Sequence, residues 1–206
     1  ASALAALQKE TIHLYDKSLE AIVHAMNLHR SDIFSDTHVN KIIEQSTSTI
    51  KIDINEIYQE DIKHLYSEII HYASTSQSYM NADGNGRIYE LKMTARHIIE
   101  MVKDVRELQK NLNYFTKIKN HEMMGQYNKL RMQLINVLRG IQAVRVDEGE
   151  DEDVFTQIEV LKMTVLENEV TINHEIDQLI RDKKIDSKMA SSLINDTGFT
   201  HSICNK

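Results

Sequence analysis

The sequence predicts an all-α fold, an up-down bundle of six or seven helices, and three observations support this. Proline is absent from the 206 residues and glycine occurs only six times, so residues that break helices are missing from nearly every long stretch. Apolar residues recur three or four positions apart, without the alternation that a half-buried strand requires. No tandem repeat of about 34 to 45 residues indicates a solenoid, so a bundle is the economical arrangement.

Apolar spacing predicts two long helices in the N-terminal part of the chain. The first is expected to have about seven turns, because apolar residues from Leu4 to Met26 fall on one helical face. A polar stretch over residues 30–36 is expected to close it, and residues 38–49 are expected to form a shorter helix. The second long helix is expected to begin at Asp53, whose carboxylate suits an N-cap, and to run toward Met80.

The most regular apolar spacing follows a predicted turn at Gly84 and Gly86, where both glycines tolerate positive φ and a helical hairpin is expected to reverse. One heptad ladder comprises Ile88, Leu91, Ala95, Ile98, Val102, Val105 and Leu112. After a turn near residues 119–121, a second ladder comprises Tyr127, Leu130, Leu134, Val137, Ile141 and Val144. Antiparallel packing of two such seams predicts that the ladders face each other.

An acidic run at residues 147–153 predicts the start of the next helix, because carboxylates are favourable at the positive end of the helix dipole. Apolar spacing resumes beyond it, with Asn168 on the seam, a position where asparagine commonly fixes register. Asp186 is the predicted cap of the final helix.

Composition limits the classes of function open to the chain. We interpret residues 1–206 as one helical domain in two approximate halves, about 1–83 and 84–206. The net charge of -7 disfavours a nucleic-acid partner, because a phosphate backbone would be repelled. The single Cys204 cannot form an internal disulfide, which favours a reducing, cytosolic compartment. No run approaches the roughly 18 apolar residues that a membrane span needs.

Motifs that carry catalysis are not found in the sequence, and no residue is predicted to be catalytic. Residues 81–92 partly match a calcium loop, but Lys92 stands where calcium needs a bidentate glutamate. The ten histidines form no HExxH pair and no duplicated Glu-x-x-His pattern of the ferritin type. The serine elbow and the phosphate-binding glycine loop are missing as well.

One acidic pair, Glu100 and Asp104, remains as a candidate metal site. On a helix these carboxylates lie one turn apart, with Cβ atoms about 5 to 6 Å from each other, close enough to share a cation. They project away from the first heptad ladder. A solvated helix face is the alternative interpretation, in which Arg96 and Lys103 neutralise the pair without metal.

The segment that contains this pair resembles the acidic-motif helix of PhoU-like domains, particularly those that follow the membrane part of bacterial sodium/phosphate cotransporters. The similarity covers residues 95–112 and extends to 13–24 and 28–30 before this segment and to 127–131, 177–181 and 189–196 after it. An acidic pair at this spacing is common in helices, whereas the ordered combination of segments is much less so.

The resemblance implies a metal-binding role for three residues. In the family, the E/D-x-x-x-D motif occurs in two similar three-helix halves and can bind iron or other metal clusters on the bundle surface. Glu100 and Asp104 match one copy. Only Asp196 carries over from the second copy, because Ser192 replaces its first acidic residue. A surface-bound iron or other divalent metal ion is therefore implied, with an incomplete second cluster.

The resemblance further implies a cytoplasmic regulatory domain, tethered to the inner face of the plasma membrane, that contacts the transmembrane part of its own phosphate transporter. Such a domain acts by binding and is not an enzyme. Two alternatives stay open. A ferritin-type metal-dependent enzyme requires carboxylates and histidines that converge inside the bundle from four helices. A homodimeric scaffold would use apolar helix faces that packing within one chain leaves uncovered.

Overall fold

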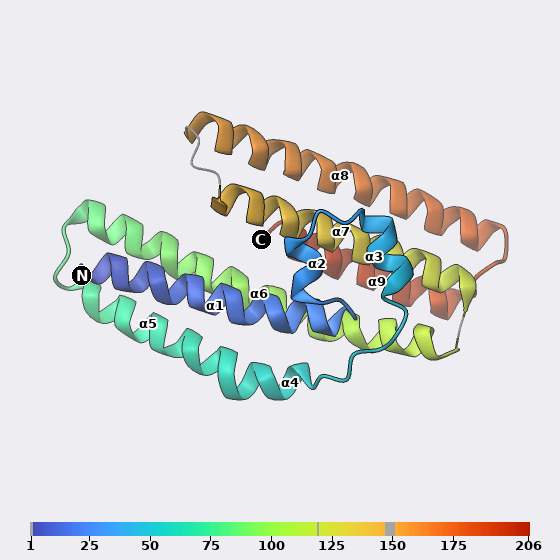
Figure 1. Ribbon diagram of the computed structural model, residues 1–206, viewed down its shortest axis with the longest axis horizontal. Helices are drawn as coiled ribbons and strands as arrows, with labels where there is room; N and C mark the ends of the chain where they lie inside the picture. Colours follow the sequence, from blue (N-terminus) through green and yellow to red (C-terminus); the bar gives the residue numbers. More distant parts are fainter. Residues whose placement is uncertain (1, 119, 147–150) are drawn as a thin grey trace.

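The computed structural model describes residues 2–118, 120–146 and 151–206, and these residues form helices and connecting segments without any strand. This confirms the all-α prediction (Figure 1). The six long helices are α1 (Ala3–Ala25), α5 (Lys63–Gln77), α6 (Ala82–Ile118), α7 (His121–Val146), α8 (Asp151–Arg181) and α9 (Ser187–Cys204). None of the helices within the described ranges combines the length and apolar character needed to cross a bilayer.

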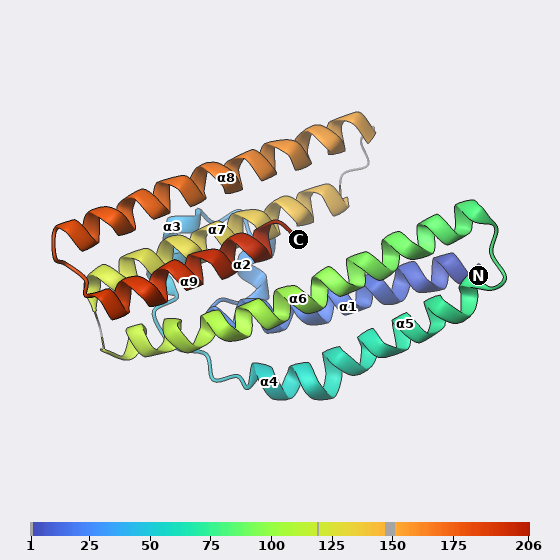
Figure 2. The same cartoon turned by 180° about the vertical axis from the view of Figure 1, so that it is seen from behind.

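The long helices form two groups of three. Helices α1, α5 and α6 contact one another, helices α7, α8 and α9 do the same, and the packing of α9 on α6 joins the groups. Both views show α8 at the outer edge of the second group (Figure 2). The division expected near residue 83 falls between α5 and α6, which pack together.

Four short helical segments connect α1 to α5. They are α2 (Arg30–Phe34), α3 (Val39–Gln45), α4 (Ile54–Ile57) and the π-helical turn η1 (Tyr58–Ile62). The polar stretch expected to close the first helix therefore forms a helix of its own, and Asp32 accepts a hydrogen bond from the His29 backbone N–H at 2.7 Å. Helices α2 and α3 both pack on α7. The N-terminal part of the chain thus reaches across to the second group.

The first heptad ladder is part of the core, as predicted. Ile88, Ala95, Ile98, Val102, Val105 and Leu112 are buried, and Leu91 is partly buried against them. The partner of this ladder is not the one expected, because α6 packs chiefly on α1 and α9, and α7 contacts α8 and α9 more than it contacts α6. Phe115 and Tyr127 stack with ring centroids 5.5 Å apart, so α6 and α7 do meet near their connection.

The two glycines of the predicted turn lie within the N-terminal end of α6. The side-chain oxygen of Asn81 accepts a hydrogen bond from the Gly84 N–H at 2.8 Å and caps the helix. No described glycine has positive φ, so the chain reverses just before the glycines and does not need their conformational freedom. Gly84 is instead close to Met80, where an added Cβ would lie 3.2 Å from the Met80 side chain.

Two predicted helix caps are confirmed by hydrogen bonds. Asp53 Oδ1 accepts from the Glu56 N–H at 3.0 Å, and Asp186 Oδ1 accepts from the Met189 N–H at 2.8 Å. The expected acidic connection lies largely outside the described residues, since 147–150 are not among them.

Candidate functional site

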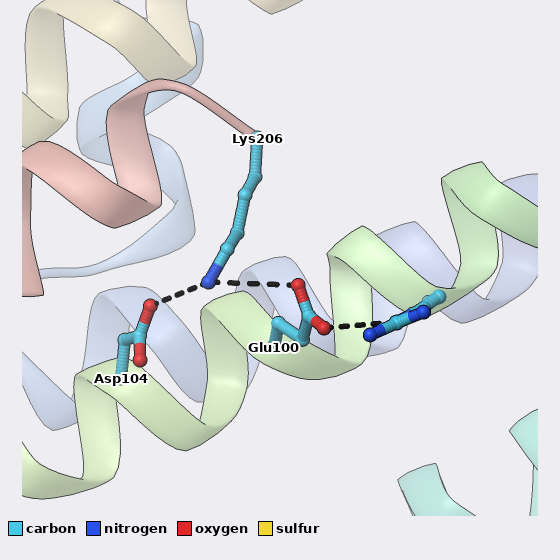
Figure 3. Close-up of polar contacts among 4 residues, drawn as sticks. Glu100, Asp104 and Lys206 are labelled. Atoms are coloured by element: carbon cyan, nitrogen blue, oxygen red, sulfur yellow. Dashed lines mark hydrogen bonds and ion pairs between the residues drawn. The ribbon is translucent and has the colours of Figure 1, made fainter.

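The predicted acidic pair lies on the central part of α6, where this helix passes the C-terminal end of α9 (Figure 3). The Glu100 side chain is 30% exposed and that of Asp104 is 18% exposed, so both carboxylates reach solvent while their backbone belongs to a packed helix. The buried residues Ile98, Ile99, Met101 and Val102 hold this stretch of α6 against its neighbours. The pair is therefore rigidly mounted and accessible.

Two cations neutralise the pair. Lys206 Nζ donates to Asp104 Oδ2 at 2.8 Å and lies 3.7 Å from Glu100 Oε2, so one ammonium group bridges both carboxylates. Arg96 Nε donates to Glu100 Oε1 at 3.0 Å. Of the two cations expected beside the pair, Arg96 contacts Glu100, whereas Lys103 instead lies over the ring of Tyr58. A cation shared by the two carboxylates would therefore have to displace Lys206.

Electrostatics favour the charged form of Glu100. Partial burial acts to raise the pKa of its carboxyl group, but the hydrogen bond from Arg96 and the positive charges of Lys206 and Arg96 together hold the pKa below its ordinary value. The carboxylate is therefore ionised at neutral pH. It is available to a cation that can displace Lys206.

Packing at the end of α9 brings Lys206 to this position. Ile203 is buried in the core, and His201 Nδ1 lies 2.8 Å from Glu169 Oε2, which joins α9 to α8. Burial raises the pKa of the adjacent Cys204 thiol to about 12, so this thiol stays protonated at neutral pH and is a poor nucleophile. The buried Ile203 and the His201–Glu169 contact hold the end of α9 in place, and this position brings Lys206 to the acidic pair.

Asp196, the third predicted metal residue, lies elsewhere and in a different environment. Only 1% of the residue is exposed, and its Oδ2 accepts hydrogen bonds from the Tyr127 hydroxyl and from Asn111 Nδ2, the latter at 2.9 Å. Burial raises the pKa of Asp196 despite these two donors, and the nearby negative charge of Glu107 raises it further. Burial and the Asp196 contact also raise the pKa of Tyr127 above its ordinary value.

The structure does not bring the three predicted residues together. Asn111, which contacts Asp196, is two helical turns beyond Asp104 on α6. Among the described residues, no group of three or more histidine, cysteine, aspartate or glutamate side chains is arranged to hold a metal ion. The convergence from four helices that the ferritin-type alternative requires is therefore not found in this part of the chain.

A set of arginines on α7 was missed by the sequence analysis. Arg131 is only 2% exposed; its Nε donates to the Met26 carbonyl at 2.8 Å, and its Nη2 donates to the carbonyls of Asn27 and Ser46, each at 3.0 Å. One guanidinium thus satisfies the C-terminal ends of both α1 and α3. Burial lowers the pKa of Arg131 to about 10. A single arginine among apolar residues gives no sequence signal for such a role, because arginine in a helix is usually solvent-exposed.

Arg139 and Arg145 also link α7 to the N-terminal part of the chain. Arg139 Nη2 donates to the Asp32 carbonyl at 2.7 Å, and Arg145 Nη1 donates to Asp16 Oδ1 at 3.0 Å while its guanidinium lies over the Tyr15 ring. Each contact links residues more than 100 positions apart in sequence.

Comparisons with known proteins assign no family to the chain. No protein-family model matches the chain, and neither the curated proteins nor the solved structures include a match.

Proposed function

We propose that this chain is a regulatory domain of a sodium-dependent phosphate transporter, which acts by binding the membrane part of its own polypeptide and performs no bond-making chemistry. Its location would be the cytoplasmic side of the plasma membrane. The proposal begins from the ordered sequence resemblance to PhoU-like domains described above.

One structural observation carries the proposal furthest. The six long helices form two groups of three, and the positions that match the family's acidic motif lie on the last helix of each group. Glu100 and Asp104 are on α6, and Asp196 is on α9. This is the distribution that the resemblance implies for two similar three-helix halves.

The chemistry of the site is compatible with a binding role. The exposed pair on α6 is held by ion pairs to Arg96 and Lys206, which can exchange for other cations. Cys204 remains protonated, and Asp196 is already engaged with two neutral donors. These groups supply charge and shape for recognition.

Transport measurements test the proposal. The intact polypeptide and a version that lacks residues 1–206 are compared for sodium-dependent phosphate uptake at low and at high external phosphate. We expect the deletion to change how uptake responds to the phosphate level. A double variant, Glu100→Gln with Asp104→Asn, is compared with Glu107→Gln, a matched change on the same helix.

Two outcomes would contradict the proposal. Uptake that is unchanged by the deletion at every phosphate level would remove the regulatory role. A coding region with no apolar spans on either side of this segment would remove the connection to a transporter.

A further inference from the structure

Arg131 is a buried cation whose neighbours in the described part of the chain are uncharged. It is only 2% exposed, and it forms no ion pair with any residue that the structure describes. Its hydrogen bonds go to three backbone carbonyls and to the side-chain oxygen of Asn128. Burial lowers the pKa of Arg131 to about 10, so the guanidinium remains charged at neutral pH. Buried charges are usually paired with an opposite charge, and Arg131 is an exception.

Partial charges nearby do not neutralise this guanidinium. The carbonyls that accept its hydrogen bonds lie at the ends of α1 and α3, and a helix C-terminus carries at most about half a negative charge. Helix α3 has only seven residues, so its contribution is smaller than that of a long helix. Asp32 acts on Arg131 through space and forms no ion pair with it. Positive charge therefore remains at this position.

A pocket of about 290 Å³ lies beside Arg131, where α3 packs on α7 (Figure 1). Among the described residues that line it, none is acidic. Thr47 and His121 line it and are exposed, so the pocket opens to solvent. Thr116 at the end of α6 and His121 at the start of α7 both line it, so the opposite dipole ends of these helices largely cancel. One water occupies about 30 Å³ in the liquid, so a small ligand fits with part of its hydration.

The wall of this pocket carries hydrogen-bond donors that no described residue uses. Arginine has no acceptor, so Asn128 must present its oxygen to Arg131, and the NH₂ group of Asn128 has no partner among the described residues. One of the five N–H groups of a guanidinium, on Nη1, is likewise left over in Arg131. The Thr47 hydroxyl also forms no hydrogen bond within the described ranges. These three donors come from α7 and from the segment after α3.

We propose that this pocket binds a small tetrahedral oxyanion, phosphate or sulfate, beside Arg131, with hydrogen bonds from Asn128 and Thr47. A planar carboxylate fits less well, because it is bound best by two parallel N–H groups of one guanidinium, and backbone carbonyls already occupy most of those of Arg131. Oxygens that point in several directions match donors from separate segments. The inference does not rest on the proposed transporter role, because it follows from charge and donors within this chain.

Calorimetric titration of the 206-residue chain with inorganic phosphate, in a chloride buffer of constant ionic strength, tests the site. We expect saturable binding of one phosphate per chain, competition by sulfate, and at least about tenfold weaker binding of acetate. Glycerol 3-phosphate in the same titration distinguishes two sources of the same chemistry. Tighter binding than that of phosphate assigns the pocket to a phosphate ester, and weaker binding assigns it to the free anion.

Asn128→Asp is the decisive variant. It keeps the oxygen that faces Arg131 and replaces the unused NH₂ group with a second carboxylate oxygen, so the chain then contains its own negative partner for the guanidinium. Phosphate affinity should fall at least about tenfold, because a donor is lost and a like charge is added. In the absence of phosphate, the midpoint of thermal unfolding should rise, because the buried cation is now paired.

Two further variants separate charge from hydrogen bonding. Asn136→Asp is the matched control, because it makes the same change on the same helix but lines a different pocket, between α7 and α8. It should change phosphate affinity by less than about twofold. Thr47→Val removes one donor without changing charge and should weaken phosphate binding about threefold. Both variants alter exposed positions and should keep the helical circular dichroism of the wild type.

Three results would overturn the proposed site. The first is a wild-type chain that shows no saturable binding of phosphate or sulfate. The second is equal phosphate affinity in Asn128→Asp and Asn136→Asp, which would place any binding outside this pocket. The third is acetate binding as tight as that of phosphate, which would exclude selection of a tetrahedral anion. Each result is obtained on the chain by itself, so it is independent of the uptake measurements that test the transporter role.

Discussion

The acidic positions on α6 and α9 have the same predicted role but opposite environments. On α6, Glu100 and Asp104 reach solvent and are paired with cations, and the pKa of Glu100 is lowered. On α9, Asp196 is buried and bound by neutral donors, and its pKa is raised. The difference follows from position in the bundle, because Asp196 is on α9, which packs on α6, α7 and α8, whereas Glu100 and Asp104 contact Lys206 just beyond the end of α9.

This comparison shows that motif spacing alone does not determine the chemistry of a carboxylate. Two carboxylates on one exposed turn can bind a cation, whereas a buried carboxylate with satisfied lone pairs connects helices. The first arrangement is suited to exchange with ligands. The second is suited to fixing how α6, α7 and α9 pack.

The largest expected effect is from Asp196→Ala. This change leaves the buried hydroxyl of Tyr127 and the amide of Asn111 without their acceptor, so we expect the free energy of unfolding to fall by about 3 kcal/mol. Urea unfolding monitored by circular dichroism measures the change. Asp104→Ala is the control and should alter stability by no more than about 0.5 kcal/mol. Equal losses in the two variants would contradict the assigned difference.

A smaller loss is expected from Tyr127→Phe. The ring that stacks on Phe115 is retained and only the hydrogen bond to Asp196 is removed, so the expected destabilisation is about 1 to 2 kcal/mol. The same urea titration measures it. Tyr114→Phe is the matched control, because Tyr114 is 55% exposed on α6, where it precedes Phe115 in the sequence. A loss below that of the control would show that the buried hydroxyl contributes nothing.

The burial of Asp196 could have been anticipated from its own helix. Leu193, Asp196, Thr200 and Ile203 are spaced three or four apart, and all four are buried. Asp196 therefore shares the apolar face of α9. Its polarity obscured this signal, because aspartate is seldom buried without partners. The partners, Tyr127 and Asn111, come from other helices and depend on tertiary packing.

Local pattern predicted the elements of the fold better than their pairing. The ladder on α6 predicted a buried face because heptad spacing requires burial against some partner, whichever helix that is. It did not specify α1 and α9 as the partners. The contacts of Lys206 with Asp104 and of Arg131 with Met26 link residues about 100 positions apart, so no local pattern could predict them.

The dependence of stability on pH should have opposite signs at the two positions. The pKa of Asp196 is raised in the folded state. Its contribution to the free energy of unfolding is therefore fully present below the unfolded-state pKa of about 3.9, and it is lost as pH rises through the folded-state pKa. The pKa of Glu100 is lowered in the folded state. Its contribution to the free energy of unfolding is therefore present above the unfolded-state pKa of about 4.3, and it is lost as pH falls through the folded-state pKa.

Variants isolate these two contributions. Unfolding free energies are measured from about pH 3 to pH 8 for the wild type, Asp196→Asn and Glu100→Gln. The wild-type advantage over Asp196→Asn should decrease with rising pH, and the advantage over Glu100→Gln should increase. Slopes of the same sign would contradict the contrast between the buried and the exposed carboxylates.

The smallest effect on stability, and the most informative one for the exposed pair, is expected from Lys206→Met. Removing the ammonium group that bridges Glu100 and Asp104 should change the free energy of unfolding by no more than about 0.5 kcal/mol. It should, however, strengthen Mn²⁺ binding at least about fivefold in calorimetry, because the competing positive charge is gone. Lys110→Met removes a lysine that pairs with Glu107 on the same helix and should leave Mn²⁺ affinity unchanged. If Lys206→Met and Lys110→Met bind Mn²⁺ equally, the acidic pair is a solvated helix face held by ion pairs, and its resemblance to a metal motif is a matter of spacing alone.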